Sequence, residues 1–113
     1  MRLLVTGGSG FIGTNLMEVY IPLGIPLVNI DWNPPLNKDQ APFWKEVDLM
    51  DPDQLQKAFE EFKPTHVVHL AARTDTDEKT DVDAYRQNHE GTRILLEVVK
   101  KFAAIERVIV TST

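Results

Sequence analysis

The chain has 113 residues, of which 42% are hydrophobic and 26% are charged, a composition typical of one globular domain. Its 12 basic and 17 acidic residues give a net charge of −5, which argues against a nucleic-acid partner because such a surface repels phosphate backbones. The absence of cysteine excludes disulfides, thiolate zinc sites and a cysteine nucleophile. No apolar run reaches the about 18 residues of a membrane helix, and residues 1–6 do not resemble a signal peptide, so we expect a cytoplasmic protein without a membrane partner.

Apolar runs alternate with amphipathic stretches, which predicts repeated β-α units. The predicted strands and helices, in chain order, are strand 2–6, helix 11–23, strand 26–30, strand 44–47, helix 51–62, strand 65–70, helix 81–103 and strand 107–112. The prolines of segment 31–43 predict a loop there. Strands that are apolar throughout predict a parallel sheet covered on both faces. Right-handed crossovers with one reversal give an α/β fold of the Rossmann type, a doubly wound parallel sheet of order 3-2-1-4-5 truncated after strand 5.

A glycine-rich loop, Thr6-Gly-Gly-Ser-Gly-Phe-Ile-Gly13, follows the first strand and opens the first helix. In this context Gly7 is expected to make the tight turn, Gly10 to let a pyrophosphate approach the backbone, and Gly13 to let the helix pack close to the sheet. The N–H groups of the first helical turn then face the phosphates. A glycine triplet alone is a weak signal, but strand, loop and helix in succession favour a dinucleotide site over a flexible turn.

Asp31 ends the second strand, about 20 residues after the glycine loop, where a carboxylate accepts hydrogen bonds from the ribose hydroxyls of a dinucleotide. A carboxylate also repels a 2′-phosphate. Trp32 and Asn33 follow it, and neither is the arginine that would accommodate that phosphate. The cofactor is therefore predicted to be NAD rather than NADP.

Five segments together make the chain resemble the extended short-chain dehydrogenase/reductase family, the NAD-dependent nucleotide-sugar epimerases and dehydratases. They are the loop TGGSGFIG, Asp31, Asp48-Leu49, the tetrapeptide HLAA at residues 69–72, and the segment NHEGT at residues 88–92. The resemblance implies that residues 1–113 form the N-terminal, NAD-binding part of a Rossmann domain, without the substrate domain. It also implies a nucleotide-sugar substrate for a full-length protein, and it is compatible with a homodimer. The cofactor-binding residues so expected are Gly7, Gly10, Phe11, Ile12, Gly13, Asp31, Asp48, Leu49, Leu70, Ala71, Ala72 and Asn88.

Catalysis in this family uses a Ser/Thr, a Tyr and a Lys, with the tyrosine exchanging a proton with the substrate hydroxyl. By position, Thr113 matches the Ser/Thr, while the chain contains no Tyr-x-x-x-Lys. We therefore expect residues 1–113 alone to show no turnover. The alternative is a non-catalytic dinucleotide-binding or redox-sensing module, which keeps a glycine loop without that motif.

The remaining ionisable residues predict no metal site. His69 lies in an apolar strand and is expected to be a core histidine, and no histidine has a partner at metal-ligand spacing. The acidic residues between 75 and 83 lack the pattern of a calcium loop and are predicted to be solvated. Arg73 either meets a phosphate or a substrate, or pairs with those aspartates.

Overall fold

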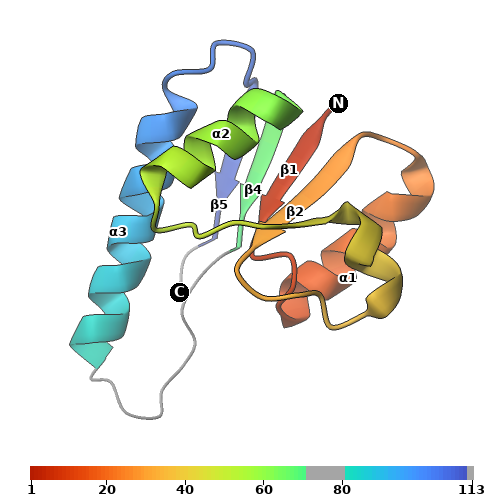
Figure 1. The fold of residues 1–113 in the computed structure, drawn as a ribbon, viewed down its shortest axis with the longest axis horizontal. Helices are drawn as coiled ribbons and strands as arrows, with labels where there is room; N and C mark the ends of the chain where they lie inside the picture. The colour runs from red at the N-terminus through yellow and green to blue at the C-terminus, as the bar shows by residue number, and fades with distance from the viewer. Residues whose placement is uncertain (71–80, 112–113) are drawn as a thin grey trace.

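The computed structural model describes residues 1–70 and 81–111, apart from the side chains of residues 81–88. Its elements alternate along the chain as the sequence predicts (Figure 1). Five strands and three α-helices have the bounds β1 Leu3–Thr6, α1 Phe11–Tyr20, β2 Leu27–Asp31, β3 Trp44–Glu46, α2 Pro52–Phe62, β4 His66–His69, α3 Asp81–Val99 and β5 Arg107–Val110, and two 3-10 helices are η1 Ile21–Leu23 and η2 Lys38–Phe43.

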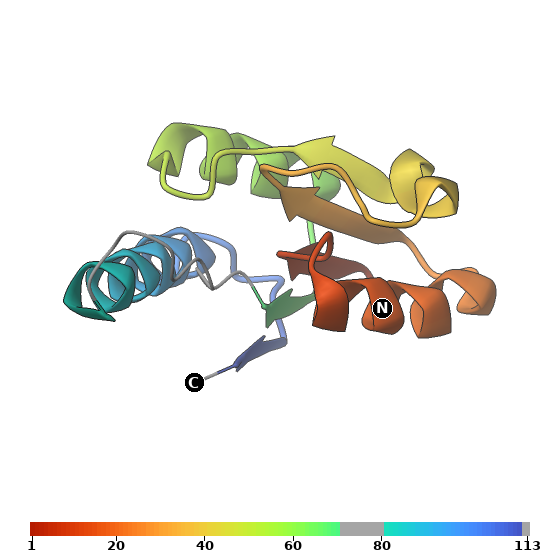
Figure 2. The same cartoon turned by 90° about the horizontal axis from the view of Figure 1, so that it is seen from below.

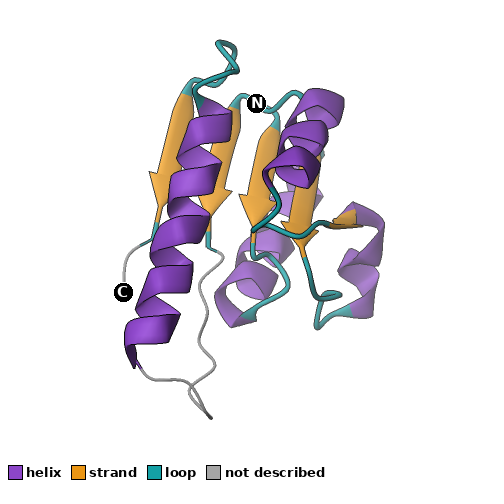
Figure 3. Ribbon diagram, turned by 60° about the vertical axis from the view of Figure 1, so that its left-hand side comes forward, coloured by secondary structure: helices purple, strands orange, loops and turns teal. Residues whose placement is uncertain are grey.

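The strands form one parallel sheet of order β3-β2-β1-β4-β5, which confirms the predicted topology. The sequence order reverses beside β1, which pairs with β2 on one side and with β4 on the other. In register, Thr6 lies between Ile30 and His69, so the carboxyl ends of the three central strands meet at one edge of the sheet. Figure 3 shows the arrowheads of these strands pointing the same way. Parallel doubly wound sheets bind ligands outside this edge, next to the point of reversal.

Two apolar clusters lie on the two faces of the sheet. Helices α2 and α3 pack on one face over Leu4, Ile30 and Val67, and α1 packs on the other over Leu3 and Val5 (Figure 2). Neighbouring residues of β1 thus point to opposite faces, because side chains alternate along a strand. Both faces of the central strands are covered, which fits the mainly apolar composition of these strands.

The edge strand β5 is not covered on both faces, in contrast to the prediction for the sheet. Val108 packs against the cluster under α2 and α3, but Ile109 remains 51% exposed and Val110 39% exposed. Helix α1 packs on Leu3, Val5 and Leu27 of β1 and β2, so within residues 1–70 and 81–111 it does not reach β5. Apolar composition alone therefore overestimates the burial of this strand.

The largest differences from the predicted elements concern the helices. The first helix ends at Tyr20 and continues as η1, because Gly24 with φ 70° then turns the chain. The proline-containing segment predicted as loop holds η2, which Asn37 begins by accepting a hydrogen bond from the N–H of Asp39 at 2.9 Å. Helix α3 ends at Val99 rather than residue 103. Among the described helices, none is long and apolar enough to cross a membrane.

Candidate dinucleotide-binding site

The glycine loop leaves β1 through a tight turn at Gly7. Gly7 has φ 74°, a left-handed conformation that side chains rarely adopt, so the predicted reason for this glycine is confirmed. Its N–H donates to the carbonyl oxygen of Ile30 at 3.1 Å, and its own carbonyl accepts from the N–H of Gly10 at 3.2 Å. The loop is thereby fixed both to β2 and across its own turn.

Gly13 lies where the structure leaves no room for a side chain. A Cβ atom there would lie 2.4 Å from the Cα atom of Gly8 and 2.6 Å from the carbonyl oxygen of Gly7. The close approach is thus between the first turn of α1 and the backbone that leaves β1. At Gly10 the nearest atom to such a Cβ would be 3.6 Å away, and the residue is exposed.

Helix α1 begins without a side-chain cap. Its N-cap residue is Gly10, which has no side chain to offer, and the following Phe11 and Ile12 are 80% and 66% exposed. The first-turn N–H groups of an α-helix have no partner within the helix, and they carry the positive end of its dipole. This end of α1 lies at the carboxyl edge of the sheet and suits an anionic group.

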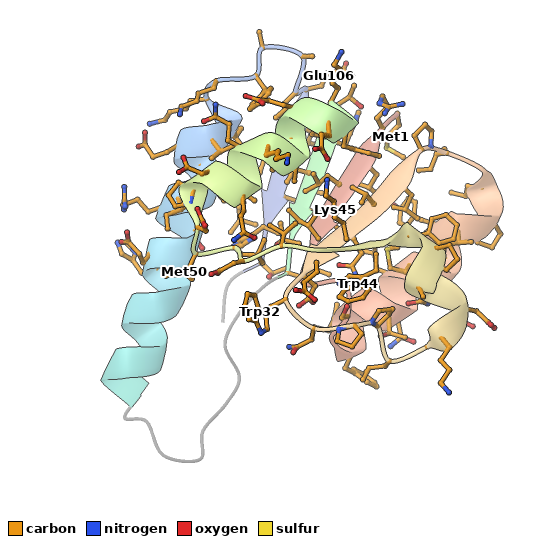
Figure 4. All side chains as sticks on the ribbon, viewed as in Figure 1. Met1, Trp32, Trp44, Lys45, Met50 and Glu106 are labelled. Atoms are coloured by element: carbon orange, nitrogen blue, oxygen red, sulfur yellow. The ribbon has the colours of Figure 1, made fainter. Side chains whose placement is uncertain are left out.

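Asp31 ends β2 beside this loop, as the sequence predicts. Its side chain is 9% exposed, and each carboxylate oxygen accepts one backbone hydrogen bond, from the N–H of Ser9 at 3.1 Å and from the N–H of Asn33 at 2.9 Å. A carboxylate has about four lone-pair sites, so two protein donors leave acceptor capacity for a ligand. Trp32 follows, 61% exposed, at the same edge (Figure 4).

Asn29 is a site residue that the sequence reasoning missed. It lies in β2 at 1% exposure and holds the loop from beneath, accepting from the N–H of Gly8 at 2.8 Å and donating to Oγ of Ser9 at 3.0 Å. The available signal was a lone amide in an apolar strand two residues before the acid, since a buried amide needs partners.

Asp48 and Leu49 follow β3 at the same edge. Asp48 closes a local turn, because its carboxylate accepts from the N–H of Met50 at 2.9 Å while its own N–H donates to the side-chain oxygen of Gln54 at 3.0 Å. Leu49 is half-buried against the cluster under α2 and α3. The structure brings this pair to the carboxyl edge of the sheet, where its contact with a cofactor remains a prediction.

His69 ends β4 and joins it to β1 and α3. Its Nδ1 lies 2.5 Å from Oγ1 of Thr6, and its Nε2 lies 3.3 Å from Oγ1 of Thr92. Burial lowers the pKa of His69 below its ordinary value of 6.5, because the charged ring would lose its hydration. It is a core histidine, as predicted. Among the described residues, no three His, Cys, Asp or Glu side chains form a group able to hold a metal.

The other predicted residues divide between described and undescribed positions. The N–H of Leu70 donates to the carbonyl of Thr6 at 2.9 Å, which places Leu70 next to the glycine loop. Ala71, Ala72, Thr113 and the side chain of Asn88 lie outside the described residues. Gly91 of α3 faces Sδ of Met50, where a Cβ atom would stand at an ordinary 3.6 Å.

Comparison with known proteins identifies this arrangement. The model of the "NAD dependent epimerase/dehydratase family" matches residues 3–113. The chain belongs to that family. A probable dTDP-glucose 4,6-dehydratase of Sinorhizobium fredii is 32% identical over 113 residues, which cover 90% of this chain and 32% of that protein. The chain spans about a third of the length of the curated relatives it matches.

Solved structures of the family have the same fold. The UDP-glucose 4-epimerase of Thermus thermophilus, in complex with NAD, is 33% identical with a TM-score of 0.75, and the match covers 92% of this chain and 35% of that one. The L-threonine 3-dehydrogenase of Trypanosoma brucei is 31% identical with a TM-score of 0.79, covering 99% and 36% of the two chains. The same N-terminal fold thus serves enzymes with different substrates.

Proposed function

We propose that this chain is the NAD-binding part of a nucleotide-sugar epimerase/dehydratase-type oxidoreductase. The observation that carries the proposal is the uncapped N-terminus of α1, which opens beside the Asp31 carboxylate at the carboxyl edge of the sheet. A phosphate group and a ribose need these two kinds of partner at one place. Bound NAD supplies a hydride acceptor for the chemistry, and the residues described here bind and orient it.

The pyrophosphate is proposed to lie at the glycine loop. Gly10 offers an exposed backbone with no side chain in the way, and the N–H groups at Phe11, Ile12 and Gly13 offer the donors. The negative net charge of the chain is no obstacle, because backbone dipoles rather than lysines supply the favourable field. The adenine is proposed to lie near Asp48 and Leu49.

Asp31 is proposed to bind the adenosine ribose and to select NAD over NADP. Its two backbone donors fix the carboxylate while leaving acceptor sites open. A 2′-phosphate would bring a second negative charge against this buried carboxylate, which is costly at short range in a protein. The remaining residues proposed to contact the cofactor are Leu70, Ala71, Ala72 and Asn88.

The substrate class is proposed from the relatives. Curated relatives that match this chain are named for dTDP-glucose, GDP-6-deoxy-D-talose and UDP-glucose, all nucleotide sugars. Thr113 is the proposed hydrogen-bonding residue for the substrate hydroxyl, with the tyrosine and lysine of the family supplied from outside residues 1–113.

Calorimetric titration of the purified chain with NAD and with NADP tests the proposal. We expect saturable binding of NAD and a dissociation constant for NADP at least about tenfold higher, equivalent to about 1.4 kcal/mol of charge repulsion. Asp31→Asn should shrink that preference, since the substitution removes the charge. Asp39→Asn, which changes an exposed aspartate in η2, is the matched control and should leave it unchanged. Absence of heat with NAD from a folded chain would refute the proposal.

A further inference from the structure

Asn29 is an unusual residue for its place in the fold. It stands in β2, the strand between β1 and β3, and its side chain is 1% exposed. Leu27, Ile30 and Asp31 of the same strand are also buried. An amide in such a place costs free energy unless its oxygen and nitrogen both find partners. Both do, and both partners belong to the glycine loop.

The amide is the centre of a relay of hydrogen bonds with one direction. The N–H of Gly8 donates to Oδ1 of Asn29 at 2.8 Å, and Nδ2 of Asn29 donates to Oγ of Ser9 at 3.0 Å. The Ser9 hydroxyl then donates to the carbonyl oxygen of Asn33 at 2.7 Å. Each donor in this series of hydrogen bonds has one acceptor, so the neighbouring groups determine which way the Asn29 amide is oriented.

The relay joins the two halves of the proposed cofactor site. One end is the loop that would carry the pyrophosphate, and the other end is the turn after Asp31 that would carry the ribose. The hydrogen bonds from Ser9 and Asn33 to the Asp31 carboxylate close the frame from the other side. Loop and acid therefore cannot shift independently while the Asn29 contacts persist.

Gly8 shows how closely the loop fits this side chain. A Cβ atom at Gly8 would lie 2.5 Å from Cγ and 2.6 Å from Oδ1 of Asn29. Gly8 does not have a positive φ, so the backbone would accept alanine there and the obstruction comes from Asn29. This second glycine of the loop is thus required by a tertiary contact rather than by its conformation.

We propose that Asn29 is a positioning residue for dinucleotide binding: its amide holds Gly8 and Ser9 so that the loop and Asp31 are preorganised for one ligand. The inference rests on the proposed function for its ligand. Preorganisation raises affinity because the protein does not lose loop freedom on binding. The alternative is a purely structural amide, whose loss would lower stability without changing the loop or the binding constant.

Two measurements on the purified chain separate these roles. The first is amide hydrogen exchange in the absence of ligand, which reports local opening of the loop. In Asn29→Ala we expect the N–H of Gly8 to exchange about tenfold faster relative to those of Leu4 and Val5 in β1, because a hydrogen bond worth about 1.4 kcal/mol is lost. The second is calorimetry, in which the dissociation constant for NAD should rise about tenfold.

Gln40→Ala is the matched control. Gln40 is another buried amide, 3% exposed, and it donates from Nε2 to the carbonyl of Thr14 at 3.0 Å, away from Gly8 and Ser9. This variant should lose stability but should change neither Gly8 exchange nor the constant for NAD. Ser9→Ala removes the link from Asn29 to Asn33, leaves the packing of β2 intact and keeps the acceptor of the Gly8 N–H. It should raise the dissociation constant for NAD with a smaller change in Gly8 exchange, and it serves if Asn29→Ala does not fold.

A double-substitution cycle adds a test that needs no ligand. Gly8→Ala should lower the urea midpoint strongly in the wild type and less in the Asn29→Ala background, where Cγ and Oδ1 are gone. Unchanged binding of NAD in both Asn29→Ala and Ser9→Ala, with the wild type binding, would overturn the positioning role alone. A folded wild type that does not bind NAD would overturn the proposed function and this role with it.

Discussion

The N-termini of α1 and α2 lie at the same edge of the sheet and are built in opposite ways. Helix α2 begins with Asp51, whose carboxylate accepts from the N–H groups of Asp53 at 3.0 Å and Gln54 at 3.4 Å. Pro52 then occupies the first turn, where its missing N–H is no loss. Helix α1 begins with Gly10 and has no such cap. The first-turn N–H groups of α2 have acceptors within the chain, whereas those of α1 have no side-chain cap and are the proposed donors to a ligand.

The difference separates stability from binding. A capped end is worth about 1 kcal/mol to the folded chain. A helix end that only a ligand can cap adds nothing to the stability of the free chain. Its N–H groups contribute to the free energy of binding when the ligand is present. The loop before α1 is instead held by side chains of β2: Asn29 accepts from the N–H of Gly8, and Asp31 accepts from the N–H of Ser9. The following predictions test whether the two ends keep these separate roles.

The largest expected effect is a loss of stability in Gly13→Ala. The added Cβ would meet backbone atoms of Gly7 and Gly8 at 2.6 and 2.4 Å, which no side-chain rotation can relieve. We expect urea denaturation to show that the free energy of unfolding falls by about 3 kcal/mol, the upper end of the range for overpacked sites. Gly10→Ala is the control, because its Cβ would make only an ordinary contact, 3.6 Å from the carbonyl oxygen of Gly7, and its free energy of unfolding should stay within about 0.5 kcal/mol of the wild type. Equal stability of all three proteins would contradict the close packing.

The next effect converts the end of α1 into an end like that of α2. Gly10 has φ −80° and ψ −177°, the extended conformation that capping residues adopt, so Gly10→Asp can cap the helix. We expect a stability gain of a few tenths of a kcal/mol and a rise of about 100-fold in the dissociation constant for NAD, because the carboxylate takes the phosphate's donors and repels it. Gly10→Asn caps without charge and should weaken binding less. Full NAD affinity in Gly10→Asp would show that the phosphate lies elsewhere.

Much of this arrangement could be predicted from local patterns. The strand order, the turn at Gly7 and the end of β2 at Asp31 follow from the alternation of apolar runs and from the glycine spacing, which are properties of neighbouring residues. The cap of α2 could be predicted for the same reason, since Asp51-Pro52 lies within one turn of its partners. In each case the residue and the cause of its position are a few residues apart.

The features that sequence reasoning missed depend on contacts between distant segments. Asn29 and Gly8 are 21 residues apart, and only the pairing of β2 with β1 brings them together. The exposure of Ile109 depends on which helix reaches β5, and the composition of β5 contains no such information. A lone polar residue in an apolar strand is the one pattern that could have directed attention to Asn29.

A smaller effect is expected at the capped end. Asp51→Ala should lower the free energy of unfolding by about 1 kcal/mol, because the N–H groups of Asp53 and Gln54 lose their acceptor. Its dissociation constant for NAD should not change. Asp53→Ala is the control, since this residue contributes only the favourable charge of a first turn, worth a few tenths of a kcal/mol. Weaker NAD binding in Asp51→Ala would show that the two helix ends are coupled.

The smallest effect concerns pH, and it arises where the carboxyl ends of β1 and β4 meet α3. Thr6, the residue before the glycine loop, contacts His69, and burial lowers the pKa of that imidazole below 6.5. Below pH 6.5 the unfolded chain therefore binds a proton that the folded chain does not, so the free energy of unfolding falls with pH there, while above pH 6.5 both states are neutral and no loss occurs. In His69→Asn this fall should be absent. Urea denaturation of both proteins at pH 8 gives the baseline cost of the substitution, and measurements between pH 6.5 and 5 should show the wild type losing stability relative to the variant. If the free energy of unfolding of the two proteins changes in parallel with pH, burial does not keep His69 neutral in the folded chain.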